Sequence, residues 1–490
     1  MTMRDRDEID RVDDAGTEPD TTQRANPRAG IHAQPGGRRH ASSGAGDIKV
    51  QAQLARLTDA IAWELDARPG LTTKGKVLEV IGTLIRIVGV DVRMGELCEL
   101  RAPDGQLLQQ AEVVGFSRDT ALLSPFGRVS DVSRDTQVVP LRRPLTIPVG
   151  NPLFGRVVDS LGRPIDGKGP IDATETRPIH ADPPNAMSRP LLKSPLFTGV
   201  RAVDAMLTLG KGQRMGIFAP AGVGKSTLMG MFARGTKCDL NVIALIGERG
   251  REVREFVEDI LGPEGMARSI VVCATSDRSS IERVKAAYAA TAIAEYFRDQ
   301  GKSVLLMMDS LTRFARAQRE IGLAAGEPPA RRGFPPSIFA ELPRLLERAG
   351  LSEHGAITAL YTVLAEDETG GDPIAEEVRG ILDGHMILSR DIAARNQYPA
   401  IDVGASLSRV MPQVAGRRQC DAAGHVRRLM AKHRDIETLI QLGEYREGAD
   451  PVADEAVRKQ EPIRQFLSQR TDESSVPEQT FDWLDRLHQV

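Results

Sequence analysis

The chain has 490 residues, and its 64 basic and 67 acidic side chains give a net charge of -3. At about 150 residues per domain this length predicts about three domains, and the charge balance leaves no overall electrostatic footprint for nucleic acid. The N-terminus is rich in charges and no run of 18 apolar residues occurs, so we expect no secretory signal, no membrane span and a cytoplasmic location.

Residues 1–47 offer almost nothing to bury. The first twenty residues carry eight acids and three bases, and a stretch rich in Gly, Pro, Arg and Ser follows, which predicts a disordered tail. In residues 48–70, apolar side chains recur at spacings of three and four from Leu54 to Leu65, before a Pro-Gly pair, which predicts a short amphipathic helix. Two interpretations stay open: the helix packs on its own domain, or it docks on another chain or a membrane surface.

Residues 71–145 predict a small β-barrel. Short β-rich runs (VLEVIGTLIRIVGV, LCELRA, AEVVGF and ALLSPF) are separated by turn signals such as Asp104-Gly105. Only Phe116 and Phe126 are aromatic here, so the region lacks the stacking platform that oligonucleotide-binding barrels use. We therefore expect a structural or oligomer-forming barrel.

Residues 146–416 predict an α/β domain. A connector rich in Gly and Pro leads into apolar runs (RMGIFA, NVIALIG, SIVVCAT, SVLLMMD and AITALYTVL) that alternate with helical stretches, as in a parallel sheet covered on both faces. Residues 417–490 return to helical patterns, LMAKHRDIETLIQL and FDWLDRL, and predict a small helical C-terminal domain. We expect Trp483 in this domain to be a core residue rather than a partner contact.

The segment APAGVGKST, residues 219–227, lies between an apolar strand and a helix, which is the context of a phosphate-binding loop (P-loop). Gly222 and Gly224 let successive N–H groups turn toward phosphate oxygens, and Lys225 reaches the β- and γ-phosphates. Ser226 supplies a ligand to Mg²⁺, and Thr227 adds a hydroxyl at the α-phosphate. The predicted nucleotide-binding set in this loop is Ala221, Gly222, Val223, Gly224, Lys225, Ser226 and Thr227.

Two carboxylates follow apolar strands. Asp309 ends SVLLMMD at the edge of the sheet where ligands bind, so we expect it to hold Mg²⁺ through water, although Asp before Ser is also a common helix cap. Glu248 ends NVIALIG and could orient a water at the γ-phosphate. Arg249, Arg251 and Glu252 follow it, so an exposed ion-pair cluster is the alternative, and spacing alone does not choose between the two.

Four longer strings resemble one family. RAVDAMLTLGKGQRMGIFAPAGVGKST, GERGREVREF, LLMMDSLTRFARAQREIGLAAGEPPARRGFPPSIFAELPRLLERAG and NQYPAIDVGASLSRVMPQV are similar to the ATPases of type III secretion systems, relatives of the rotary ATP synthase subunits. The resemblance covers residues 74–490 and is closer to the non-flagellar, Hrp-like branch. It implies a RecA-like P-loop core with an N-terminal barrel and a C-terminal helical domain, assembled as a hexamer that hydrolyses ATP with Mg²⁺.

The resemblance also implies roles for single residues. Glu248 falls on the catalytic glutamate of the family, and Arg249 on an arginine close to the γ-phosphate. Arg409, in SLSRVM, matches the arginine finger that reaches the nucleotide of the adjacent subunit. Tyr398, in QYPAID, matches the residue against which adenine packs. Glu252 and Arg313 are expected to lie next to these groups and to hold them in position without contacting the nucleotide.

The implied function is that of a motor that releases chaperones from effectors and promotes effector unfolding and export. The implied partners are a peripheral stator protein, a central stalk protein, chaperone–effector complexes and, by peripheral association at the inner membrane, the export apparatus; no nucleic acid is expected. A flagellar export ATPase is the main alternative. A rotary synthase subunit, a ring-shaped RNA translocase and a non-catalytic nucleotide-holding scaffold are the others, and RNA-stimulated ATPase activity would identify the translocase.

Overall fold

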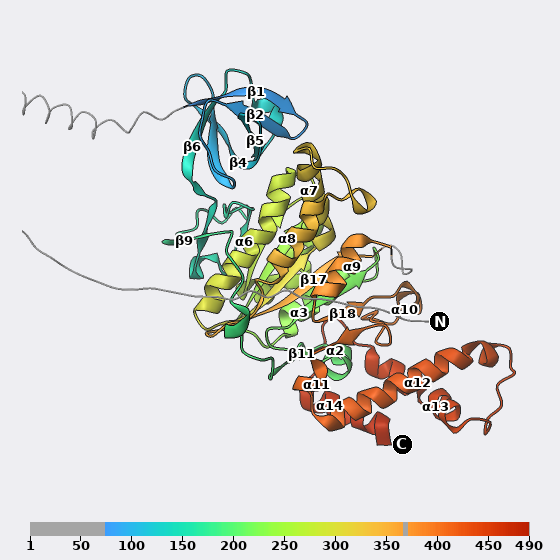
Figure 1. Cartoon of the computed structure of the whole chain (residues 1–490). Helices are drawn as coiled ribbons and strands as arrows, with labels where there is room; N and C mark the ends of the chain where they lie inside the picture. The colour runs from blue at the N-terminus through green and yellow to red at the C-terminus, as the bar shows by residue number, and fades with distance from the viewer. Residues whose placement is uncertain (1–73, 366–370, 490) are drawn as a thin grey trace, which may run out of the picture. The chain divides into compact units, whose positions relative to one another are not determined.

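The computed structural model describes residues 74–365 and 371–489 (Figure 1). The predicted tail and amphipathic helix, residues 1–47 and 48–70, lie outside the described residues. A closed antiparallel barrel, a largely parallel sheet with helices and a C-terminal group of helices follow one another along the chain. The predicted α/β fold class, with an N-terminal barrel and a C-terminal helical domain, is therefore confirmed. The domain boundaries stay predictions.

The barrel consists of six antiparallel strands in the order β1-β2-β5-β4-β3-β6. The strands are β1 (Gly75–Ile81), β2 (Leu84–Val88), β3 (Glu96–Arg101), β4 (Leu107–Ser117), β5 (Thr120–Pro125) and β6 (Gln137–Pro144). Ile85, Ile87, Val113 and Leu123 are fully buried in one cluster inside it. Because β1 pairs with β6, each strand has a partner on both sides and the barrel has no open edge.

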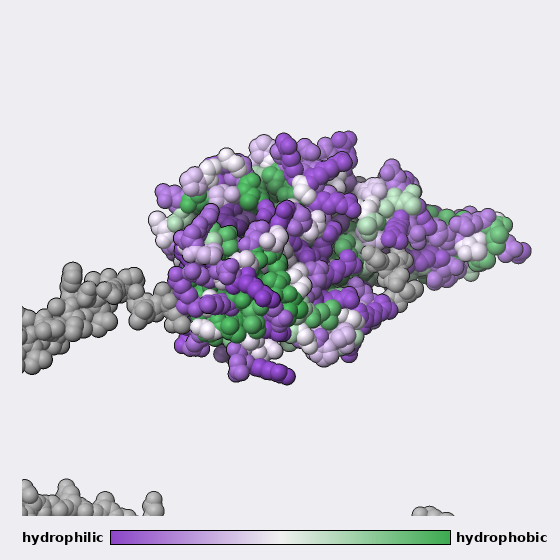
Figure 2. Space-filling model, turned by 90° about the horizontal axis from the view of Figure 1, so that it is seen from above, coloured by the Kyte–Doolittle hydropathy of each residue, from purple (hydrophilic) through white to green (hydrophobic). Residues whose placement is uncertain are grey.

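Apolar side chains also lie on the outer surface of the barrel. Leu78 and Val80 on β1 and Leu107 and Phe116 on β4 are about half exposed. Figure 2, which views the molecule from above, shows apolar areas that interrupt a largely hydrophilic surface. Because β1 and β4 are not neighbours in the barrel, these side chains form two separate groups, and exposed apolar groups are typical of surfaces that contact another protein.

The segment between the barrel and the main sheet adds short strands that the sequence did not predict. β7 (Thr146–Val149) pairs with β9 (Glu175–Pro178) as a separate two-stranded sheet. β8 (Val157–Val158), inside the predicted connector, joins the edge of the main sheet in parallel with β14. A run of two valines among glycines and prolines is too short to identify as a strand before its partner is known.

The main sheet has the strand order β19-β18-β12-β17-β15-β13-β14-β8. Its further strands are β12 (Arg214–Ala219), β13 (Leu240–Ile246), β14 (Ser269–Ala274), β15 (Ser303–Asp309), β17 (Ala356–Leu364), β18 (Gly384–Ile387) and β19 (Leu407–Ser408). Neighbours pair in parallel except β18 with β19, and β16 (Gly350–Leu351) pairs antiparallel with β17. Every residue of β13 and β15 is buried, as continuous apolar runs predict for strands covered on both faces.

Alternate side chains of the strands enter two separate hydrophobic clusters. Val242 and Ala244 pack with α6 (Ser280–Asp299), α7 (Leu311–Ala324) and α8 (Pro336–Leu346). Ile243 and Leu245 pack on the other face with α2 (Arg201–Met206) and α3 (Lys225–Gly235). The remaining α-helices of this part are α4 (Gly250–Glu255), α5 (Gly262–Ala267), α9 (Pro373–Ile381), α10 (Arg390–Ala394) and α11 (Met411–Val414).

Three helices make up the C-terminal part: α12 (Arg417–Gln441), α13 (Pro451–Leu467) and α14 (Pro477–Gln489). Trp483 on α14 is partly buried, and its ring packs edge-on against Phe466, with 5.5 Å between the ring centres, so it is a core contact as expected. Within residues 74–365 and 371–489, no helix combines the length and the apolar character needed to cross a membrane.

Candidate nucleotide site

The P-loop connects the end of β12 to the start of α3. Gly222 and Gly224 have φ angles of 82° and 88°, a left-handed conformation that glycine adopts without steric cost. Val223 is 3% exposed and anchors the loop in the core between them. The N-terminus of α3 leaves unpaired N–H groups for which a phosphate is a suitable partner. Four predicted nucleotide-binding residues of this region are exposed: Ala221, Gly222, Ser226 and Thr227.

Asp309 ends β15 and is 3% exposed. The Lys225 ammonium donates a hydrogen bond to its Oδ1, and so does the Thr362 hydroxyl on β17, at 2.7 Å. Asp309 does not cap the following helix, because Ser310 does so by accepting from the N–H of Arg313. Sequence reasoning did not identify Thr362, since only the sheet order brings β17 next to β15.

Glu248 follows β13 and is 8% exposed. Its Oε2 accepts a hydrogen bond from Nη2 of Arg313 at 3.2 Å, and its Oε1 lies 3.9 Å from Nζ of Lys225. Nε of Arg313 is 3.1 Å from Oε1, as an ion pair without hydrogen-bond geometry, so Oε1 is buried with no hydrogen-bond partner among the described residues. A buried acceptor in this state is suited to binding a water or a ligand.

Burial is the largest influence on the Glu248 carboxyl, and the nearby Asp309 charge adds to it. Together they raise the pKa of Glu248 to about 7, against the lowering effect of Lys225 and Arg313. A carboxylate with this pKa can accept a proton near neutral pH, which suits a general base. The Glu248–Arg313 ion pair is therefore a candidate catalytic unit.

Arg249 and Glu252 lie at the surface beside this unit. The Arg249 side chain is 79% exposed, and its Nη1 pairs with Oε1 of Glu252 at 3.1 Å. The neighbouring Glu248 carboxyl is the largest influence that lowers the pKa of Glu252, and the Arg249 charge adds to it. The exposed ion pair that the sequence left open thus exists, but it involves Arg249 and Glu252, whereas Glu248 is buried.

Tyr398 lies against the P-loop although it is 174 residues from Gly224 in sequence. A Cβ placed on Gly224 would be 3.5 Å from Cε1 of the Tyr398 ring, an ordinary van der Waals contact. The side chain is 40% exposed, so part of the ring stays free. The structure therefore brings the predicted base-packing residue to the predicted phosphate-binding loop.

Arg409 is a predicted site residue that forms no hydrogen bond or ion pair with Lys225, Glu248 or Asp309 within the described part of this chain. It follows β19, the edge strand of the main sheet, and its side chain is exposed. Its backbone N–H donates to the carbonyl of Asp383 at 3.0 Å.

Family models identify the class of protein that this fold and site define. The nucleotide-binding domain of the ATP synthase alpha/beta family matches residues 199–408, and the beta-barrel domain of the same family matches residues 77–142. A third model, the T3SS EscN ATPase C-terminal domain, matches residues 415–486. The chain is therefore an ATPase of the ATP synthase alpha/beta class.

Individual relatives narrow this class. The type 3 secretion system ATPase of Xanthomonas euvesicatoria is 69% identical over 410 residues, 84% of this chain and 93% of the relative. That of Sinorhizobium fredii is 53% identical over 414 residues, and the flagellum-specific ATP synthase of Bacillus subtilis 50% over 415; each match covers 84% of this chain, with 92% and 94% of the relatives. The assembled ATPase EscN of the enteropathogenic E. coli type III secretion system has a TM-score of 0.80 at 45% identity, over 84% of this chain and 99% of that chain. The chain belongs to the type III secretion system ATPase family.

Proposed function

We propose that this ATPase binds ATP with Mg²⁺ at the interfaces of a hexameric ring and uses hydrolysis to release chaperones from effectors and to promote effector unfolding and export. The observation that carries the hydrolytic part is the meeting of Lys225, Asp309 and Glu248 at the carboxyl ends of the strands that open into the site. The buried, unpartnered Oε1 of Glu248 supports a place for the attacking water.

In the proposed reaction the Lys225 side chain moves, so that its ammonium leaves Asp309 and binds the β- and γ-phosphate oxygens, where it neutralises their negative charge. Glu248 accepts a hydrogen bond from the attacking water through Oε1 and takes its proton as the bond from the water oxygen to the γ-phosphorus forms and the bond from that phosphorus to the bridging oxygen of ADP breaks. Arg313 holds Glu248 through Oε2 and favours its ionised form. Binding of phosphate thereby releases the Asp309 carboxylate from its pairing with Lys225.

Ser226 and Asp309 would hold Mg²⁺, with Asp309 acting through a water. Hydroxyl and carboxylate oxygens are the donors that this hard cation prefers, and Asp309 is buried at the end of β15 while Ser226 is exposed on the first turn of α3. When bound, the ion supplies positive charge at the β- and γ-phosphate oxygens. The half-free ring of Tyr398 would pack against the adenine, because it lies over Gly224 at the mouth of the P-loop.

A ring accounts for the position of Arg409. An exposed arginine at the sheet edge can reach a transition state in the adjacent subunit, where its guanidinium neutralises developing charge. Neighbouring barrels would cover the exposed apolar side chains of β1 and β4. Solved structures describe EscN as an assembled ATPase and as a complex with its central stalk EscO, the latter with a TM-score of 0.78 at 45% identity, over 84% of this chain and 99% of that chain. These relatives support an oligomer and a stalk partner for this chain as well.

The stator protein, the chaperone–effector complexes and the membrane export apparatus are proposed from the family resemblance. So is the site of action, in the cytoplasm at the inner-membrane face of the secretion apparatus. Flagellar protein export is the second candidate, because the flagellum-specific relative of Bacillus subtilis is 50% identical.

The first test is ATPase activity with Mg²⁺ as a function of protein concentration, with the molecular size measured in parallel and single-stranded RNA added to one series. We expect specific activity to rise steeply as the oligomer forms and to be indifferent to RNA. Full activity of a monomer would contradict the shared site, and strong stimulation by RNA would favour a nucleic-acid motor.

A further inference from the structure

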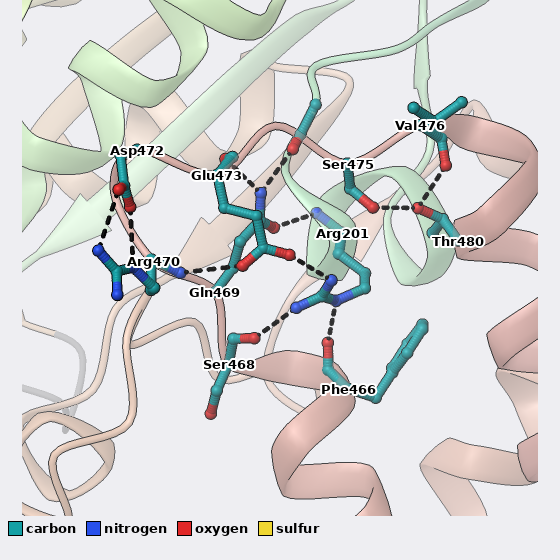
Figure 3. Close-up of polar contacts among 11 residues, drawn as sticks. Arg201, Phe466, Ser468, Gln469, Arg470, Asp472, Glu473, Ser475, Val476 and Thr480 are labelled. Atoms are coloured by element: carbon teal, nitrogen blue, oxygen red, sulfur yellow. Dashed lines mark hydrogen bonds and ion pairs between the residues drawn. The ribbon is translucent and has the colours of Figure 1, made fainter.

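Residues 468–476, which we call the α13–α14 loop, are tied to α2 by Arg201 (Figure 3). The Arg201 guanidinium donates to the carbonyl of Phe466 at 2.7 Å, to that of Ser468 at 2.6 Å and to Oε1 of Glu473 at 2.7 Å. Its carbon lies 4.7 Å from the centre of the Trp483 ring. Because Arg201 is only 7% exposed, these bonds form a buried attachment of the loop to the nucleotide domain.

Gln469 makes the second attachment and uses both ends of its amide. Its Oε1 accepts the backbone N–H of Arg201 at 2.8 Å, and its Nε2 donates to the carbonyls of Gly199 and Glu473, each at 2.8 Å. Two carbonyls and one N–H as partners fix which end of the amide is oxygen. Gln469 is 6% exposed, so loss of its side chain would leave these backbone groups without their protein partner.

The backbone of the same residue reaches the base side of the nucleotide site. The N–H of Gln469 donates to the carbonyl of Tyr398 at 2.8 Å. Tyr398 is the residue that lies over Gly224 of the P-loop. Gln469 therefore connects Tyr398, the residue proposed to pack against the adenine, with Arg201 on α2 and with Gly199. We call the side-chain hydrogen bonds of Gln469 to these two residues the clamp.

The loop also touches the phosphate side, where Nη2 of Arg234 donates to the carbonyl of Thr471 at 2.8 Å. Arg234 is in the last turn of α3, whose first residue is Lys225. This contact is exposed, and α3 is held independently by its buried face, which includes Leu228 and Phe232. Tyr398 is 40% exposed and has less packing of its own. Loss of the clamp should therefore disturb the base side more than the phosphate side.

We propose that Gln469 is a positioning residue that sets the affinity for the adenine base by fixing Tyr398 through the α13–α14 loop. The proposal rests on the base-packing role given to Tyr398 under the proposed function. Under this proposal, the way in which the C-terminal helices pack on the nucleotide domain influences the affinity for the nucleotide. Gln469 itself touches neither the nucleotide nor the reacting atoms.

The test compares binding of Mg²⁺–ADP and Mg²⁺–pyrophosphate to the full chain carrying Gln469→Ala, with Gln469→Met as a second variant that keeps the volume. We expect ADP affinity to fall about three- to tenfold, as for the loss of one or two net hydrogen bonds, and pyrophosphate affinity to stay within about twofold. The KM for ATP should rise in proportion while kcat is little changed. Gln465→Ala, at an exposed glutamine four residues earlier on α13, is the matched control and should change the affinity for neither ligand.

A double-mutant cycle with Tyr398→Ala separates this inference from the proposed function. If Gln469 acts through Tyr398, adding Gln469→Ala to Tyr398→Ala should cause no further loss of ADP affinity. Additive losses, or equal losses for ADP and pyrophosphate, would overturn the positioning role. Unchanged ADP affinity in Tyr398→Ala alone would instead overturn the base-packing role of Tyr398. If Tyr398→Ala binds ADP more weakly but both Gln469 variants bind it as the unmodified protein does, only the role of Gln469 is overturned.

Discussion

Two buried charge clusters of the same domain differ in how completely their bonds are satisfied. Arg348 and Glu295, each 1% exposed in their side chains, form two parallel bonds of 2.9 and 2.6 Å, and Nη1 of Arg348 donates to the carbonyl of Ile179 at 2.7 Å. Glu248 is nearly as buried, yet its Oε1 has no hydrogen-bond partner in the described part of the chain. The first cluster is complete within the protein, and the second is not.

This difference separates a structural cluster from a functional one. A buried pair with all its donors and acceptors matched holds the fold, and removal of one partner strands a charge. A buried carboxylate with a raised pKa and an acceptor atom without a partner lowers the stability of the fold. A residue that lowers stability in this way indicates a functional role. The two clusters should therefore respond in opposite ways to mutation, one in activity and the other in stability.

The largest effect is expected for Arg409→Ala. If Arg409 neutralises charge in the transition state of the adjacent subunit, its loss should lower kcat by about 10³-fold or more. Oligomer formation and ADP affinity should change little, since the side chain is exposed within one chain. Steady-state ATPase assays with sizing check this, and a kcat within about threefold of the unmodified protein would contradict the role.

Glu248→Gln should lower kcat by about 10²- to 10⁴-fold, because the amide cannot accept the proton of the attacking water. Nucleotide affinity should be retained, and the Tm should be unchanged or higher, since the variant removes a buried charge with an unsatisfied oxygen. Parallel activity, ADP-binding and unfolding measurements test the three statements. Glu255→Gln, an exposed neighbour on α4, serves as control, and an active Glu248→Gln enzyme would exclude the catalytic role.

The structural cluster should show the reverse pattern. Arg348→Met leaves Glu295 as an unpaired buried charge and should cost about 3–5 kcal/mol of unfolding free energy. Arg344→Met breaks an exposed pair with Glu341, in which Arg344 is 73% exposed, and should cost about 1 kcal/mol or less. Denaturant unfolding of both variants measures the contrast. Equal costs would show that burial and bond satisfaction do not distinguish the two arginines.

The smallest effect concerns pH. Because burial and the Asp309 charge raise the pKa of Glu248 to about 7, a base at this position is lost as pH falls, and kcat/KM should decrease below about pH 7. Arg313→Met removes a positive charge that lowers this pKa, so the inflection should move to higher pH. If the inflection lies at the same pH in the unmodified protein and in Arg313→Met, it belongs to the titration of ATP and not to Glu248.

The sequence was most informative where side chains follow strands. Lys225, Glu248 and Asp309 each come directly after an apolar run or its turn, and the carboxyl ends of parallel strands meet at one edge of the sheet. The five predicted apolar runs correspond to β12, β13, β14, β15 and β17. These contacts could be predicted because the relevant information is local: the strand, the turn and the residue after it.

Other contacts could not be predicted because they depend on which elements become neighbours. Thr362 and Asp309 are 53 residues apart, and so are Arg348 and Glu295. The attachment of Gln469 to Arg201 spans 268 residues. Helix α13 was missed although Asp450, which caps it, and Pro451 at its first position form a start signal. The signal marks where α13 begins, but the apolar side chains of this helix form a core only by packing against α12 and α14.

The most direct test of a site shared between subunits is a mixing experiment with Arg409→Ala and Lys225→Ala. Each variant alone should be nearly inactive, because one lacks the finger and the other lacks the lysine of the P-loop. In a mixed ring, an intact Lys225 of one subunit can meet an intact Arg409 of its neighbour, so the account predicts activity well above that of either variant. A mixture no more active than the average of the two variants, with mixed oligomers demonstrated, would contradict the shared site.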